Sequence, residues 1–201
     1  MNLFILRHGE SVWNREKRVQ GSKDPGLSEK GKRQAKSAGS RLKKKKIDII
    51  YSSPLKRCAQ TARIISRKTG AKIRFIPGMQ EIILGVWQGK TIDEVKRLYP
   101  ASYAVWTKEP SKAAIPGWEG VPKFRKRVDR AFKTILEKNP AANVCVVAHW
   151  GVIAAHLAKT LDADFNRIFQ GVRVDNCGIS EISYMNGKAI IQCINDTRLL
   201  S

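Results

Sequence analysis

The chain has little that would carry it into a membrane or out of the cell. No apolar run reaches the roughly 18–20 residues that cross a bilayer. The short apolar stretch Leu3–Leu6 has neither the basic leader nor the cleavage site of a signal peptide. The 4 cysteines lie far apart and form no CxxC pair, which favours reduced, mostly buried thiols. We therefore expect a cytoplasmic protein with no membrane partner.

Acidic residues are also scarce. The 201 residues include 17 Asp and Glu against 38 Lys and Arg, which gives a formal net charge of +21. The basic residues gather in three segments, Lys30–Lys46, Lys56–Arg74 and Lys123–Lys133. A surface of this sign attracts anions, so charge alone permits nucleic acid, anionic lipid or phosphorylated metabolites as partners. It equally permits a solvated basic surface with no dedicated partner.

Repeats, low-complexity tracts and linkers are absent, so we expect one domain over residues 1–201. Segments with the apolar pattern of strands alternate with segments of helical periodicity. The predicted strands are Leu3–Leu6, Ile47–Tyr51, Lys72–Ile76, Asn143–Ala148, Ile179–Met185 and Lys188–Ile194. The predicted helices are Ser28–Lys46, Leu55–Thr69, Ile92–Tyr99, Val121–Lys138 and Gly151–Leu161. Residues 101–119 are predicted to be irregular or to form short helices.

This alternation predicts an α/β fold. Strands separated by helices indicate a mostly parallel sheet covered on both faces, which is a three-layer α/β/α sandwich. Asn186-Gly187 lies between the last two strands and is a strong hairpin signal, so we expect an antiparallel C-terminal hairpin at one edge. In open sheets of this kind, ligands bind at the carboxyl ends of the strands.

Titratable side chains follow four separate predicted strands, so they should meet at one edge of the sheet. The set consists of two histidines, two arginines and one glutamate: Arg7, His8, Arg57, Glu81 and His149. Guanidinium groups match phosphate oxygens in pairs, and a neutral imidazole can attack phosphorus. A second histidine can stabilise charge on the phosphoryl oxygens, and a carboxyl group can exchange protons with the leaving group and water. This set suits phosphoryl transfer without a metal or other cofactor.

Several motifs together resemble the histidine phosphatase superfamily, the phosphoglycerate mutase-like proteins. They are "LRHGES" with Asn14, "QGSKDPGLSEKGKRQA", "YSSPLKRCAQTA", Glu81 before "GVWQGK", and "VVAHWGVI". In register, the resemblance covers roughly residues 1–160. "RHG" alone is a weak signal, whereas "RHG" with "SSPLKRCAQTA" and a late "AHxG" is a specific one.

The resemblance implies a role for each matched residue. His8 would be the phosphohistidine nucleophile, and Glu81 would be the proton donor and acceptor. Arg7, Arg57 and His149 would line the phosphate pocket. Contacts to phosphate or substrate are further implied for Asn14 and the backbone around Gln20 and Gly21.

The sequence departs from the family pattern in two places. The family often has glycine after the second histidine, and this chain has Trp150. Its backbone N–H can still bind phosphate, while the indole can narrow the mouth of the pocket or pack behind the sheet. In the later loop, "PGWEG" stands where the family often has a "GES"-like stretch, which leaves the role of Glu119 open.

Other candidate residues have ordinary structural interpretations. His156 lies two helical turns past His149, so we expect helix packing rather than a zinc site with His8 and His149, which would lack carboxylate or thiolate partners. Asp24 should turn its loop and support the start of the next helix. Three tryptophans can shape a pocket or fill the core: Trp13, Trp87 and Trp106.

The leading function is a metal-independent phosphomonoester hydrolase that acts on a small phosphorylated metabolite and releases inorganic phosphate. The resemblance favours the phosphatase branch, which includes α-ribazole phosphatases, phosphoserine phosphatases and broad-specificity phosphatases. A cofactor-dependent phosphoglycerate mutase is the alternative within the fold, although such mutases are usually longer and carry an "ERHYG"-like stretch.

A polyanion-binding module on the same fold is the alternative from another class of function. No nucleic-acid-reading motif is present, so specific binding of nucleic acid is not expected. The C-terminal hairpin edge would permit a homodimer.

Overall fold

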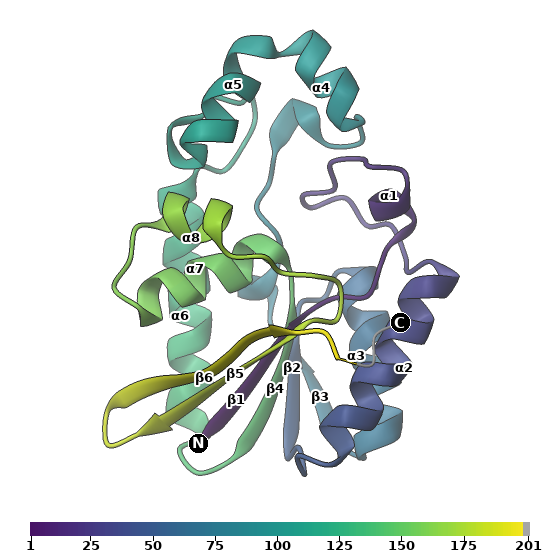
Figure 1. Ribbon diagram of the computed structural model, residues 1–201, viewed down its shortest axis with the longest axis vertical. Coiled ribbons are helices and arrows are strands. Elements are labelled where there is room, and N and C mark those ends of the chain that lie inside the picture. The colour runs from purple at the N-terminus through teal and green to yellow at the C-terminus, as the bar shows by residue number, and fades with distance from the viewer. Residues whose placement is uncertain (199–201) are drawn as a thin grey trace.

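A computed structural model describes residues 1–198 of the chain, and within this range six strands form one sheet (Figure 1). The strand order is β3-β2-β4-β1-β5-β6. The parallel strands are β1 (Asn2–Arg7), β2 (Ile49–Ser52), β3 (Lys72–Phe75) and β4 (Asn143–Ala148). The antiparallel edge pair is β5 (Ile179–Met185) and β6 (Lys188–Asp196). The predicted mostly parallel sheet with a C-terminal hairpin is confirmed.

Helices cover both faces of the sheet because β1 is apolar on both sides. Phe4 and Leu6 pack in one core with the helices α2 (Glu29–Lys43) and α3 (Lys56–Thr69). Leu3 and Ile5 belong to the opposite core, which contains residues of α6 (Val121–Lys138), α7 (Trp150–Thr160) and α8 (Phe165–Gly171). Successive residues of a strand point to opposite faces, so one short strand contributes to both layers.

A cap lies beyond the carboxyl ends of the parallel strands. It includes α4 (Ile92–Leu98) and α5 (Pro100–Lys108), which lie at the top of Figure 1, and the short α1 (Val12–Arg15). Single turns of 3₁₀ helix connect it: η1 (Pro77–Met79), η2 (Gly85–Trp87) and η3 (Pro110–Lys112). A small core of its own, built on Trp87, Val95, Ala113 and Ile115, holds the cap together.

The capping residues in the sequence predicted correctly where helices begin, whereas the predicted ends of short strands and helices differ from the observed ones. Ser28 caps α2, and the Thr91–Glu94 capping box starts α4, both as predicted. The strand predicted at Ile47–Tyr51 lies instead at Ile49–Ser52. Pro100 ends α4 but also begins α5, because proline is well suited to the first position of a helix. Helix α8 was not predicted, because a helix of seven residues is too short to show a clear helical periodicity in the sequence.

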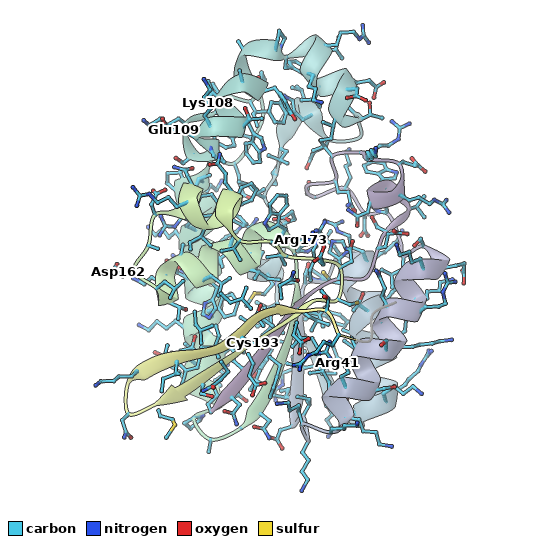
Figure 2. The ribbon with its side chains drawn as sticks, in the orientation of Figure 1. Arg41, Lys108, Glu109, Asp162, Arg173 and Cys193 are labelled. Carbon is cyan, nitrogen blue, oxygen red and sulfur yellow. The ribbon has the colours of Figure 1, made fainter. Side chains whose placement is uncertain are left out.

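The basic residues largely occupy the outer faces of the helices. Arg41 of α2 lies beside β6 and forms an ion pair with Asp196, with 2.6 Å between Nη2 and Oδ2 (Figure 2). The 4 cysteines are free thiols, and three of them are buried. Along residues 1–198, no helix combines the length and apolar character needed to cross a membrane.

The loop after β1 and the start of α2 approach each other so closely that both sides need glycine. A Cβ at Gly31 would lie against the carbonyl oxygen of Glu10, and one at Gly9 would lie against the carbonyl of Gly31. Gly9 therefore lets α2 come close to the segment that carries His8.

We predict that Gly31→Ala lowers the free energy of unfolding by about 1–3 kcal/mol, because the added methyl group forces two backbone segments apart. In an ordinary helix the same change would be stabilising. Gly171→Ala, at the end of α8 with no atom within 4 Å of the new Cβ, is the matched control and should be tolerated. Urea denaturation measures the free energy of unfolding of both variants. Equal values for Gly31→Ala and Gly171→Ala would contradict the close approach of the loop after β1 to α2.

Candidate active site

His8 and His149 meet because the strands that precede them, β1 and β4, are neighbours in the sheet. β1 pairs in parallel with β4, and Arg7 lies opposite Ala148. His8 and His149 therefore follow their strands at the same level, and the backbone N–H of His8 donates to the carbonyl of Ala148 at 3.0 Å. Their ring centroids are 5.3 Å apart, and both side chains are buried.

The surroundings of His8 select one neutral tautomer. Its Nδ1 lies 2.8 Å from the carbonyl oxygen of Gly9. A carbonyl only accepts hydrogen bonds, so Nδ1 carries the proton and Nε2 keeps its lone pair. Burial lowers the pKa of His8 well below its usual value, and the nearby charges of Arg57 and Arg7 lower it further. The imidazole is thus a neutral group with a free basic nitrogen.

Two guanidinium groups lie beside His8 and bind backbone carbonyls rather than carboxylates. Arg57, buried in the first turn of α3, donates to the carbonyls of Lys23 at 2.7 Å and Gly21 at 2.8 Å. Arg7 donates to the carbonyl of Val174 at 2.9 Å. Within residues 1–198 neither arginine forms an ion pair, and the Nε of each has no hydrogen-bond partner. Buried cations are normally paired, so this arrangement is suited to an anionic ligand.

His149 is held from the side of α3. Its Nε2 lies 2.9 Å from Ser53 Oγ and 3.4 Å from Cys58 Sγ. Burial lowers its pKa well below the usual value, and Arg57, His8 and Arg7 add to the effect. His149 is therefore neutral beside these cations, and a bound dianion would favour its protonation.

Glu81 reaches the same site from the segment after η1. Its carboxyl oxygens accept hydrogen bonds from the backbone N–H groups of Ile82 at 2.9 Å and Gly151 at 3.2 Å. Burial raises its pKa, although both hydrogen bonds and Arg57 oppose the shift. A Cβ at Gly151 would lie 2.5 Å from Glu81 Oε1, so only glycine permits this approach. Gly151 was missed by the sequence reasoning, which considered only the glycine that Trp150 replaces.

An ion pair behind Glu81 positions its segment, and the sequence reasoning also missed it. Arg127 of α6 donates to the backbone carbonyls of Gly78, Gln80 and Glu81 at 2.6–3.0 Å. It also forms an ion pair with Glu119, whose carboxylate accepts from the backbone N–H of Ile83 at 2.9 Å. Glu119, whose role was left open, thus holds the segment that carries Glu81. In the sequence, Arg127 was only one basic residue among many on a helix.

The remaining predicted residues line a cavity of about 370 Å³. The same cavity is also lined by Arg7, His8, Arg57 and Glu81. Asn14, Gln20, Gly21 and Trp150 all line it. The Asn14 side-chain oxygen accepts from the backbone N–H of Ser11 as part of the cap of α1. Trp150 does not pack behind the sheet, since it is 37% exposed and lines the cavity.

His156 and Asp24 were expected to have structural roles, and both have such a role, although Asp24 supports a different helix from the one expected. His156 stacks on Phe132 with 3.6 Å between ring centroids and hydrogen-bonds to Tyr184, and burial lowers its pKa to about 3. It is a packing residue, as predicted, and does not join the other histidines. Asp24 accepts a hydrogen bond from the N–H of Lys56, so it supports the start of α3 rather than of the next helix, α2.

We predict that Arg127→Met releases the segment around Glu81, because it removes the ion pair to Glu119 and the bonds to three carbonyls. Amide exchange at Ile83, followed by NMR, should accelerate at least about tenfold, with a loss of about 2–4 kcal/mol in stability. The control is Lys126→Met, an exposed neighbour on the same helix, which should change neither. Unchanged protection of Ile83 in Arg127→Met would show that the pair does not position this segment.

Comparisons with known proteins agree with this geometry. A family model described as histidine phosphatase superfamily (branch 1) matches residues 3–197. Phosphoserine phosphatase 1 of Hydrogenobacter thermophilus is 33% identical over 98% of this chain and 93% of its own length. Phosphoglycerate mutase-like protein 4 of Arabidopsis thaliana is 34% identical over 84% of this chain and 80% of its own length.

A solved structure is also similar over its full length. Bacillus stearothermophilus YhfR superimposes with a TM-score of 0.94 at 27% identity, covering 100% of this chain and 99% of that one. The family match extends past the region where the motifs were recognised and includes β5 and β6. The chain belongs to the histidine phosphatase superfamily, branch 1.

Proposed function

We propose that the protein hydrolyses the phosphomonoester of a small metabolite through a phosphohistidine on His8, without a metal ion. The observation that carries this proposal is the position of a neutral, Nδ1-protonated His8 beside two guanidinium groups that form no ion pair with a carboxylate of residues 1–198. Such a site binds a dianionic phosphoryl group and offers a lone pair to its phosphorus atom.

The first step transfers the phosphoryl group to His8. Nε2 forms a bond to phosphorus while the bond from phosphorus to the ester oxygen breaks, and the proton of Glu81 passes to that oxygen. Arg7, Arg57 and a protonated His149 stabilise charge on the remaining oxygens. The raised pKa of Glu81 supports its role, because a general acid must hold its proton until the leaving group departs.

The second step returns the enzyme to its starting state. Glu81, now a carboxylate, takes a proton from water as the water oxygen forms a bond to phosphorus. The bond between phosphorus and Nε2 breaks, and its electron pair returns to the imidazole. Inorganic phosphate is released, and Glu81 has regained its proton.

A phosphoglycerate mutase is the second candidate, because several similar relatives are named phosphoglycerate mutases or mutase-like proteins. The short spacing between Glu81 and His149 and the lack of an "ERHYG"-like stretch support the hydrolase instead. Incubation with 3-phosphoglycerate and bisphosphoglycerate separates the two, since a mutase would form 2-phosphoglycerate faster than inorganic phosphate. A single domain over residues 1–201, a cytoplasmic location and a homodimer stay predictions.

We predict that acid-quenched enzyme carries acid-labile label after a single turnover of a ³²P-labelled aryl phosphate, since phosphoramidate bonds hydrolyse in acid. His8→Ala should carry none and should lose turnover by at least about 10³-fold, with EDTA present throughout. Glu81→Gln, which keeps the nucleophile, should still become labelled. Acid-stable label, or equal labelling of His8→Ala, would exclude the proposed intermediate.

We predict that Glu81→Gln slows the hydrolysis of esters with poor leaving groups at least about 10²-fold more than that of esters with good ones, because only the former need the proton.

The pH profile of kcat/KM provides a second test of the roles of His8 and Glu81. Activity requires neutral His8, so it falls at acid pH below the lowered pKa of His8. It also requires protonated Glu81, so it falls above the raised pKa of that carboxyl group, and Glu81→Gln should lose this alkaline limb. Equal losses on both kinds of ester would show that Glu81 is not the general acid.

A further inference from the structure

Five aromatic rings form an unbroken series of contacts along one wall of the cavity beside His8. The rings of Trp150 and Phe169 stack with 4.6 Å between centroids and an interplanar angle of 5°. Phe169 contacts Trp106 at 5.5 Å, and Trp106 contacts Trp87 at 5.7 Å. Trp87 then contacts Tyr103 at 6.1 Å. All five residues line the cavity, and we call them the aromatic wall.

The aromatic wall runs from the proposed phosphate site to the cap. At its inner end, the guanidinium carbon of Arg7 lies 6.0 Å from the centroid of the Trp150 ring. At its outer end, Tyr103 and Trp106 belong to α5 (Figure 1). A group attached to a phosphate bound at Arg7 would therefore extend along these rings. Trp13 and five aliphatic residues also line the cavity: Val19, Ile82, Leu84, Ile92 and Val95. Its polar lining residues include Asn14, Lys17, Arg18 and Gln20.

The cavity offers a positively charged group at most one carboxyl group. Of the described residues that line it, Glu81 alone has a carboxyl group, and burial raises its pKa, which disfavours the charged form. Arg18 at the rim is engaged by Glu16 at 2.8 Å and by the carbonyl of Gly89 at 2.9 Å. An ammonium group placed here would lose its hydration, and the described lining residues offer it no charged partner other than Glu81.

We propose that the natural substrate carries its phosphate on a flat, apolar ring system without an ammonium group, and that the aromatic wall binds this ring. The inference rests on the proposed function, since it concerns the leaving group of the same reaction. It separates this chain from relatives named phosphoserine phosphatases, whose named substrate carries an ammonium group.

The size of the expected preference follows from the surface that the ring buries. A ring of naphthyl size that stacks on Trp150 and Trp106 removes apolar surface of both partners from water, which favours the ring ester about 100-fold over a small alkyl ester. This preference should appear in kcat/KM, because the wall contacts the leaving group and not the reacting atoms.

The test compares esters that differ in the ring and share the chemistry of the leaving oxygen. Both 2-naphthylmethyl phosphate and ethyl phosphate release a primary alkoxide, so their ratio of kcat/KM reports contacts of the leaving group. O-phosphoserine is the third substrate and adds an ammonium and a carboxylate group. We expect the naphthylmethyl ester to exceed both others by about 100-fold.

Variants of the aromatic wall should reduce this ratio. Trp150→Ala, at a position that is 37% exposed, and Trp106→Ala should each lower the ratio of the ring ester to ethyl phosphate about tenfold. Trp106→Phe, which keeps a ring and protects the packing of α5, should restore most of it. Phe75→Ala is the matched control, because Phe75 is an exposed aromatic residue on β3 outside the cavity, and it should leave the ratio unchanged.

The outcomes separate this inference from the proposed function. Turnover that depends on His8 but is equal for the three esters, or highest for O-phosphoserine, would overturn the ring proposal and leave the hydrolase standing. An unchanged ratio in both tryptophan variants would do the same. Absence of hydrolysis of every ester, with p-nitrophenyl phosphate included, would instead contradict the proposed function. Calorimetry with 2-naphthylmethylphosphonate would then still test whether the aromatic wall binds the ring.

Discussion

The parallel pairing of β1 with β4 is the constraint on which the site depends. Because Arg7 lies opposite Ala148, the residues that follow the two strands emerge at the same level of the sheet. Both strands are buried on both faces, so a shift of register would expose apolar residues in two cores at once. The packing that stabilises the fold therefore also holds His8 beside His149.

This pairing brings cations and imidazoles into a small volume, which has an electrostatic consequence. Arg7 and Arg57 are held by backbone carbonyls, so their positions do not depend on a carboxylate that would neutralise them. Their charges and the burial of the site keep both histidines neutral. The basic surface of the rest of the chain has the same sign, so anions are attracted toward the whole molecule before they reach the cavity.

The position of Glu81 has a different origin, since its segment belongs to no strand. The carboxyl group is held by the backbone of Ile82 and of Gly151, and its segment is held by Arg127 and Glu119. Apart from Ile82, these residues come from the start of α7, from α6 and from the loop before α6, all of which are far from Glu81 in sequence. Strand patterns could predict that Glu81 reaches the site but not what holds it there, because each supporting residue has an ordinary local context.

The sequence by itself determined the sheet, the hairpin and the motif residues that follow the strands. Those features are local: apolar runs, caps at Ser28 and Thr91, the Asn186-Gly187 turn, and His8 and His149 directly after buried strands. Only the tertiary structure decided that Gly151 must be glycine, that Arg127 pairs with Glu119, and that separate segments form the aromatic wall. The physical reason is that these contacts join side chains from distant elements, and no local pattern records which face of one element will meet which face of another.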